Sequence, residues 1–349
     1  MGTMAEMLST PLGVVEWFVY LLAAVMFVIG LHLMNSPKTA RKGNMVSAIG
    51  MILAVVMAFI VLFAGEISNG FQHGVAVVLL IAGIIIGAVA GVVSAKKVKM
   101  TDMPQLVSVF NTVGGGAAAL VALNDILTSE GTPSVVVLIT AGLGIMIGSV
   151  TFSGSLIAAG KLQGIKWVKK LSLPGKGFWN ILFAVLTVAS FIMLCVQPGQ
   201  RLLWSVLTTV FALCYGLVFV IPIGGADMPV VISVLNACTG TAVAMSGLAI
   251  NNIALIVAGA LVGAAGVTLS IAMSKAMNRP LLSVLAGGFG GANAAAGAGE
   301  GPEGTMKETS ADDLAVQLVY AEKVIFVPGF GLAQAQAQRE LADLGVLLK

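Results

Sequence analysis

Nine long apolar segments occupy most of this 349-residue chain and limit the folds open to it. They lie at about 14–34, 45–65, 75–95, 104–124, 133–158, 179–196, 203–221, 229–249 and 252–274. As helices, with a rise of about 1.5 Å per residue, segments of this length cross a hydrocarbon core of about 30 Å. Only 9% of the residues are charged, whereas a soluble domain has about 25%. The sequence therefore predicts an all-α polytopic membrane protein with about nine transmembrane helices, the sixth and seventh being the shortest.

The lysine and arginine residues predict the orientation of these helices, because basic residues are enriched in cytoplasmic connections. Thirteen of them fall in connections on one side: Lys38, Arg41, Lys42, Lys96, Lys97, Lys99, Lys161, Lys166, Lys169, Lys170, Lys176, Lys275 and Arg279. The connections on the other side hold Arg201 alone. We therefore expect the N-terminus outside and the C-terminal tail in the cytoplasm. No basic region precedes the first apolar segment and Glu16 lies within it, so we expect a retained helix rather than a signal peptide.

A ten-residue pattern occurs twice, as DMPQLVSVFN from Asp102 and as DMPVVISVLN from Asp227. At a constant offset of 125 residues, Asp102, Pro104, Ser108 and Asn111 correspond to Asp227, Pro229, Ser233 and Asn236. If each proline opens a helix, each asparagine lies two turns, or roughly 10 Å, inside it. A buried amide is costly in hydrocarbon unless it has a polar partner or water. The repeat therefore predicts a polar pathway between helices.

Three other interpretations of the repeat remain open. The asparagines would also serve as structural groups that hydrogen-bond across helices, worth about 0.6–2 kcal/mol each. Asp227 would also stabilise a helix N-terminus through its charge. Both copies enter the bilayer from the predicted cytoplasmic side, and each precedes a glycine-rich helix. This arrangement is also typical of a secondary transporter built on a parallel two-helix repeat, with its substrate near the bilayer midplane.

The cysteines, histidines and basic residues indicate no metal site and no nucleic-acid partner. Cys195, Cys214 and Cys238 all lie in apolar segments without a CxxC spacing, and His32 and His73 are on opposite predicted sides. We expect both histidines at the level of the lipid headgroups. The net charge of +3 follows from the loop lysines, and no basic face is interleaved with aromatic residues on a soluble domain.

The last seventy residues differ from the apolar part of the chain. Residues 281–312 are rich in Gly, Ala and small polar residues and predict a flexible linker. Residues 313–349 predict a short amphipathic helix at 313–320, a strand at Val324–Val327, a turn at Gly329-Phe330-Gly331 and a helix from about Leu332. Strand, glycine turn and helix open a dinucleotide-binding βαβ unit. We therefore expect a transmembrane domain at 1–280, this linker, and a truncated Rossmann-like βα start.

Five segments resemble the β subunit of the proton-translocating NAD(P) transhydrogenase, over about Arg41 to Gln338. They are KMTDMPQLVSVFN, GSVTFSGSLIAAGKLQG, GGADMPVVISVLN, SKAMNRPLLSVLAGGFG and VIFVPGFGLAQAQAQ. The resemblance implies a membrane domain that couples inward proton flow to hydride transfer from NADH to NADP. It implies an NADP(H) domain after the β-subunit helices and an NAD(H) domain on a partner α subunit. It further implies a homodimer of αβ units in the inner (plasma) membrane.

The resemblance also implies roles for particular residues. Asn236, with Ser233 one turn before it, matches the proton path, and Asp227 matches an acidic residue at its cytoplasmic mouth. Asn111 stands where some family members have a titratable histidine, and an amide does not protonate near neutral pH. That substitution leaves the proton acceptor to water, to Asp227 or to a residue of a partner chain.

The resemblance also implies that the tail contains the beginning of a nucleotide site. Gly329, Phe330 and Gly331 match the start of the NADP(H) site, where a tyrosine is usual in place of Phe330. Fewer residues follow Val324 than the roughly 30 that a βαβ unit needs. We therefore expect no complete NADP(H) site, no catalytic residue and no activity from residues 1–349 alone. The tail favours the transhydrogenase over the transporter, because a transporter has no need of a strand and glycine turn.

Overall fold

The computed structural model describes residues 10–64, 70–99, 102–129, 131–166, 168, 175–278, 280–286, 310–329, 332 and 337–348. Within these ranges, nine helices are long and apolar enough to cross a membrane. They are α2 (Pro11–Leu33), α3 (Ala40–Ala64), α4 (Gly70–Lys97), α5 (Met103–Thr128), α6 (Val135–Leu162), α8 (Lys176–Val196), α9 (Arg201–Val220), α10 (Met228–Ala249) and α11 (Ile253–Ala276). The nine predicted spans are confirmed to within a few residues, and α8 and α9 are the shortest, with 21 and 20 residues.

Five short helices complete the described structure. They are η2 (Pro198–Gln200), η3 (Gly225–Asp227), α12 (Leu281–Ala286), α13 (Ala311–Val319) and α15 (Gln338–Leu347). The all-α prediction for the membrane part is therefore confirmed.

Several helix ends follow directly from the local sequence. The hydroxyl of Ser134 accepts a hydrogen bond from Val137 N at 3.3 Å, and Asn252 Oδ1 accepts one from Leu255 N at 3.0 Å. These side chains cap α6 and α11, where the first backbone N–H groups have no partner in the helix. Asn251 adopts a φ of 55° after the end of α10, a left-handed conformation that asparagine tolerates better than most residues.

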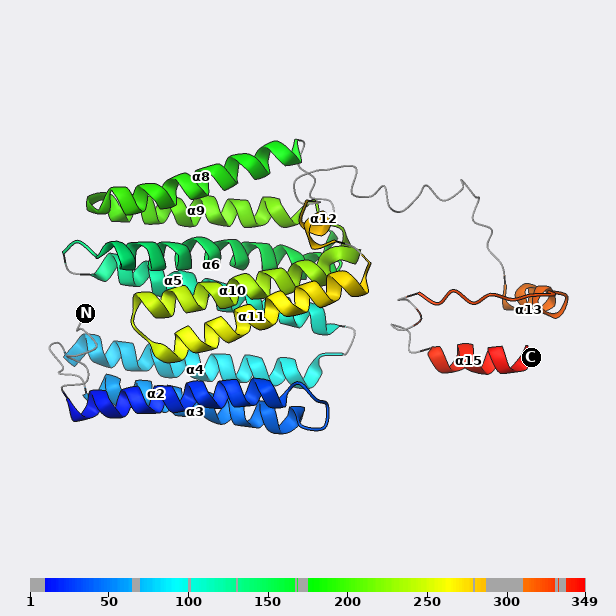
Figure 1. Ribbon diagram of the computed structural model, residues 1–349, viewed down its shortest axis with the longest axis horizontal. Coiled ribbons are helices and arrows are strands. Elements are labelled where there is room, and N and C mark those ends of the chain that lie inside the picture. Colours follow the sequence, from blue (N-terminus) through cyan, green and yellow to red (C-terminus); the bar gives the residue numbers. More distant parts are fainter. Residues whose placement is uncertain are drawn as a thin grey trace. The chain divides into compact units, whose positions relative to one another are not determined.

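Four helices form the centre of the bundle. α5 packs along α6, α10 packs along α11, and α10 also contacts both α5 and α6. α9 lies on α6 and pairs with α8, whereas α2 lies on α11 and pairs with α3 (Figure 1). The two helices that carry the repeated sequence pattern, α5 and α10, are therefore in direct contact inside the bundle.

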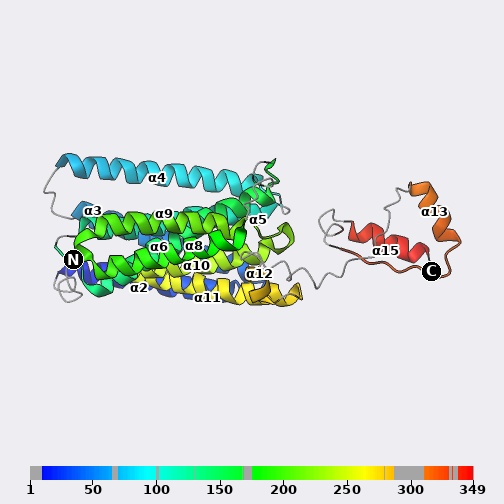
Figure 2. The same cartoon turned by 90° about the horizontal axis from the view of Figure 1, so that it is seen from above.

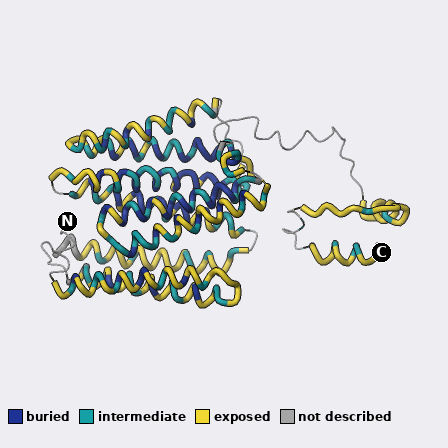
Figure 3. Tube along the Cα trace, in the orientation of Figure 1, coloured by how far each residue is buried: buried dark blue, intermediate teal, exposed yellow. Residues whose placement is uncertain are grey.

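Burial decreases from the centre of the bundle outward. In α10, 61% of the span is buried, whereas no residue of the α4 span is buried (Figure 3). Figure 2 shows α4 at the margin of the bundle. Leu79 and Ile86 on α4 are 66% and 69% exposed, as expected for side chains that face lipid or another membrane protein.

Close backbone contact between α10 and α11 depends on glycine. A Cβ at Gly240 would overlap the backbone nitrogen of Gly263, and a Cβ at Gly266 would lie 2.7 Å from Ala237 N. α5 and α6 approach in the same way at Gly115 and Gly148. Small residues at these positions let membrane helices pack at short range, where dispersion contacts stabilise the pair.

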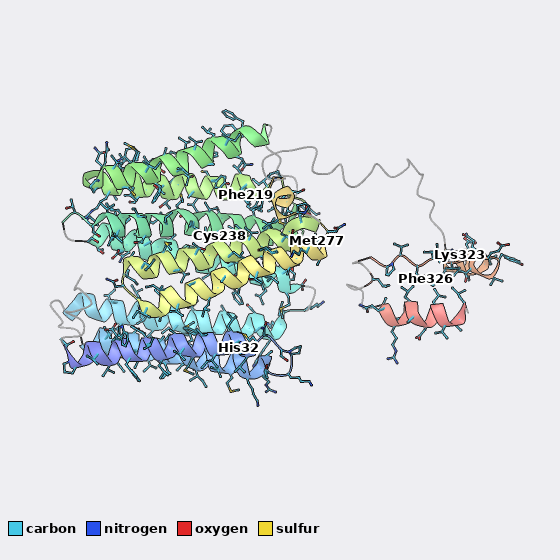
Figure 4. The ribbon with its side chains drawn as sticks, viewed as in Figure 1. His32, Phe219, Cys238, Met277, Lys323 and Phe326 are labelled. Atoms are coloured by element: carbon cyan, nitrogen blue, oxygen red, sulfur yellow. The ribbon has the colours of Figure 1, made fainter. Side chains whose placement is uncertain are left out.

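The segment predicted as a linker begins with a helix. α12 packs on α10 and α11, and its Val284 is 3% exposed. Val284 belongs to the same apolar cluster as Phe219 and Met277, both labelled in Figure 4. Leu281, Val284 and Leu285 form an apolar face at helical spacing, so this turn stays on the bundle.

The tail forms a separate compact unit, Ala295–Lys349. The predicted amphipathic helix is present as α13, and Ser310 caps it by accepting a hydrogen bond from Asp313 N at 3.2 Å. The predicted strand at Val324–Val327 is wrong, because these residues form neither helix nor strand. A strand needs a neighbour for its backbone hydrogen bonds, and the described tail offers none.

The helix that we predicted from Leu332 begins later, as α15 at Gln338, and residues 333–336 lie outside the described part. The ring of Phe326 lies against α15, 3.9 Å from the Cβ position of Gly345 (Figure 4). The Rossmann-like start is thus not formed in the described tail.

Candidate functional site

The first copy of the repeat lies inside the bundle and bonds to α6 through one residue. Asn111 Nδ2 donates to the hydroxyl of Ser155 at 2.7 Å, and Ser108 Oγ donates to the Ser155 carbonyl at 2.8 Å. Asn111 is 5% exposed, and Ser108 and Ser155 are fully buried. Ser155 therefore holds both polar side chains of α5 in place.

The second copy bonds to α11 in a similar way, with one difference. Ser233 Oγ donates to the Gly266 carbonyl at 3.2 Å, which matches the bond between Ser108 and the Ser155 carbonyl. Gly266 has no side chain, so the hydroxyl that binds Asn111 has no equivalent in this copy. Asn236 is half-buried and forms no hydrogen bond with another described residue. The two asparagines therefore have different environments despite their matching sequence positions.

Two buried side-chain oxygens of the two repeat helices have no hydrogen-bond partner within the described part of the chain. They are Asn111 Oδ1 on α5 and Thr239 Oγ1 on α10. Thr239 lies next to α5, since its methyl carbon is 3.3 Å from the Cβ position of Gly114. Buried polar atoms are nearly always hydrogen-bonded in folded proteins, so these positions favour water or a partner group.

We call the row formed by Ser108, Asn111, Ser155, Ser233, Asn236, Thr239 and Ser246 the polar seam.

The acidic residues of the repeat lie just before their helices. Asp102 precedes α5 and Asp227 precedes α10, and neither carboxylate caps its helix by a hydrogen bond. The backbone N–H of Asp227 donates to the Gly224 carbonyl at 3.1 Å and closes the turn before α10. Both carboxylates thus mark the same end of their helices, the end predicted to face the cytoplasm.

Lys161 stabilises the connection that leads to Asp227. Its ammonium donates to the carbonyls of Val220 at 3.2 Å and Ile223 at 2.8 Å, and also to that of Ile221. These carbonyls lie at the C-terminal end of α9, where backbone acceptors lack helical partners and a positive charge is favoured. Lys161 therefore ties the end of α6 to the turn between α9 and α10.

We expect Lys161→Met to lower the stability of the protein by about 2 kcal/mol, because hydrogen bonds to a charged group contribute about 1.5–3 kcal/mol. The thermal-unfolding midpoint of the purified chain in detergent measures this loss. Lys166→Met is the matched control, since Lys166 is exposed. Equal midpoints for the two variants would contradict the role assigned to Lys161.

The other predicted positions are the glycine turn of the tail, the two histidines and the three cysteines. Gly329 belongs to the tail unit, and Phe330 and Gly331 lie outside the described residues. His32 is exposed at the end of α2, and the side chain of His73 is likewise not described. The three cysteines are free thiols. Across the described residues, no group of three or more His, Cys, Asp or Glu side chains is arranged to hold a metal ion.

Sequence reasoning missed three residues of this region. Ser155 lies on α6, outside the repeated pattern, and its contact with Asn111 depends on how α5 and α6 pack. Ser246 donates to the Ala118 carbonyl at 3.0 Å and joins α10 to α5. In the sequence, Lys161 serves only to predict the orientation of the helices, and its contact with the end of α9 becomes visible only in the structure.

The fold and the seam define a class, a polytopic helical membrane protein whose central helices carry a duplicated polar motif. The family model described as NAD(P) transhydrogenase beta subunit matches residues 16–349. Two sequences from Rhodospirillum rubrum, both described as NAD(P) transhydrogenase subunit beta, are 40% identical over 339 residues. The matches cover 95% of this chain and 70% of each relative. The chain therefore belongs to the NAD(P) transhydrogenase β-subunit family, and the transporter interpretation has no support.

Proposed function

We propose that this chain is the proton-conducting membrane part of a transhydrogenase that couples proton flow to hydride transfer between NADH and NADP. The polar seam carries the proposal, because it holds two buried oxygens, Asn111 Oδ1 and Thr239 Oγ1, that have no hydrogen-bond partner in the described part of the chain. Membership of the β-subunit family supports it. Such oxygens are expected to bind water, and bound water is what a proton needs to cross a membrane protein.

The side chains of the seam relay a proton without holding it. Amides and hydroxyls both donate and accept hydrogen bonds, so Asn111, Ser233 and Asn236 can order a chain of water molecules. Asn236 has no partner among the described residues and is the side chain best placed to bind that water. Asp227 provides a carboxylate that binds and releases the proton at one mouth of the seam.

The nucleotides bind outside the membrane helices in this proposal. An α subunit, which the family implies as a partner, supplies the NAD(H) domain. The NADP(H) site begins at Gly329, Phe330 and Gly331 in the tail. The described tail does not by itself fit NADP(H), because it lacks the strand that sets a phosphate-binding glycine turn against a helix N-terminus. No step of the proton path is therefore assigned to the nucleotide.

The proposed function also implies where the protein lies in the cell and how it is oriented in the membrane. We place the protein in the inner membrane, with the N-terminus outside and the tail in the cytoplasm. The bias of basic residues toward one side supports this orientation. A homodimer of αβ units is the proposed assembly.

Two arms of one reconstitution test this function. Residues 1–349 alone in lipid vesicles are expected to bind no NADP(H) by calorimetry and to transfer no hydride. With the α subunit and a complete NADP(H) domain supplied, hydride transfer from NADH to an NADP analogue is expected to change the pH inside the vesicles. Tight NADP(H) binding by residues 1–349 would refute the nucleotide assignment. Hydride transfer without any pH change would refute the proton path.

A further inference from the structure

α5 carries three side-chain oxygens that are buried and accept no hydrogen bond in the described part of the chain. They are Gln105 Oε1, Asn111 Oδ1 and Asp125 Oδ2. The amides of Gln105 and Asn111 can only relay a proton, whereas the carboxylate of Asp125 can bind one and release it. α5, α6, α10 and α11 are described in full, and Asp125 is the one acidic residue within them. A lone carboxylate in this setting is by default a functional group.

Asp125 lies on the side of α5 that faces α10. Asn111, Ala118 and Asp125 follow one another at intervals of seven residues, which places them on one side of the helix. The Ala118 carbonyl accepts the hydrogen bond from Ser246 of α10, so this side faces α10. Ile126, adjacent to Asp125, is fully buried in a cluster with residues of α6, α8 and α10, so this end of α5 is packed inside the bundle. Asp125 therefore lies on the row that contains Asn111.

The position of Asp125 along α5 is opposite to that of Asp102. Asp102 precedes the helix, and Asp125 lies three residues before its last residue, Thr128. The intervening turns span about 35 Å at a rise of about 1.5 Å per residue, compared with a hydrocarbon core of about 30 Å. Carboxylates thus mark both ends of the polar seam: Asp102 and Asp227 at one end, and Asp125 at the other.

We infer that Asp125 is the proton-exchanging group at the end of the seam opposite Asp227. This role rests on the proposed function and names the second mouth of its path. The carboxylate takes a proton from bulk water, passes it to water molecules held by Ser246, Thr239 and Asn111, and returns to its charged form. Asn111 and Asp125 are roughly 21 Å apart along the helix, so several water molecules join them. Ser246 lies between them.

Asp125→Asn in the reconstituted complex tests this inference. We expect hydride transfer and the linked pH change to fall together by at least about tenfold, a difference of about 1.4 kcal/mol in the barrier. Asp125→Glu is expected to keep most of the activity. A structural role predicts the opposite order, because asparagine preserves the shape of aspartate and glutamate does not. Glu16→Gln is the matched control, since Glu16 lies on α2, away from the seam. The activity of the Glu16→Gln complex should equal that of the wild type.

The outcomes separate this inference from the proposed function. If the wild-type complex transfers hydride without a pH change, the proposed function fails. If the wild type couples the two and Asp125→Asn does so equally well, only the assignment of Asp125 fails.

A labelling experiment decides the question if Asp125→Asn does not assemble. Asp125→Cys is introduced into a chain whose Cys195, Cys214 and Cys238 are replaced by serine. A membrane-impermeant cationic thiol reagent is expected to label it from the vesicle face opposite the tail. An absence of labelling from that face would overturn the inference.

Discussion

Asn236→Leu is expected to lower the proton-linked turnover of the reconstituted complex by at least about tenfold, while the protein still inserts and assembles. Asn236 is half-buried and has no hydrogen-bond partner among the described residues, so its loss leaves no other described group unsatisfied. Leucine removes both the donor and the acceptor from the seam. Stability is therefore largely retained while the water chain is interrupted.

Asn124→Leu is the matched control for this experiment, because Asn124 is an exposed asparagine on α5. The rates of hydride transfer and of vesicle acidification or alkalinisation are measured for both variants. If Asn236→Leu and Asn124→Leu both match the wild type, Asn236 is a packing residue and the seam does not conduct through it.

Gly240→Leu is expected to have the largest effect on the fold. A Cβ at Gly240 already overlaps the backbone of Gly263, and the backbone of a packed helix cannot move aside as a flexible side chain does. Inserting extra atoms into a packed core costs about 1–3 kcal/mol, and separating two helix backbones costs more. We expect the purified chain to lose its thermal-unfolding transition or to fail to accumulate in the membrane.

Gly83→Leu provides the comparison for Gly240→Leu within the same chain. Gly83 lies on α4, and nothing lies within 4 Å of its Cβ position. The isolated chain is therefore expected to tolerate this change with its midpoint unaltered. A Gly240→Leu variant that unfolds at the wild-type temperature would show that α10 and α11 do not pack through their glycines.

The sequence predicts the helices of this protein well because membrane spans depend on local properties. Length and apolar content determine whether a segment crosses the bilayer, and both are visible without knowledge of any neighbour. The limits of the spans also follow from local signals, such as Ser134 at the start of α6 and Asn252 at the start of α11. Nine predicted spans therefore match nine observed helices in the described residues.

The contacts of the candidate site depend on packing and are much harder to predict. The repeat identifies Asn111 and Asn236 as related positions, but the rotation and sliding of α6 and α11 decide which partner each meets. Ser155 meets Asn111, whereas Gly266 occupies the matching place in the second copy. The predicted strand at Val324–Val327 failed for a related reason, because a strand forms only with a neighbour and local propensity cannot supply one.

The glycine at position 266 has a consequence for how the two halves of this protein can evolve. A serine there would restore the hydroxyl that the first copy carries at Ser155, but its Cβ would collide with the backbone of Ala237. The second copy therefore cannot return to the hydrogen bonding of the first by a single substitution without separating α10 from α11. Exchange of sequence between the duplicated segments is blocked at this position. The two copies therefore differ in a lasting way: the Asn111 amide is held by Ser155, and the Asn236 amide has no hydrogen-bond partner among the described residues.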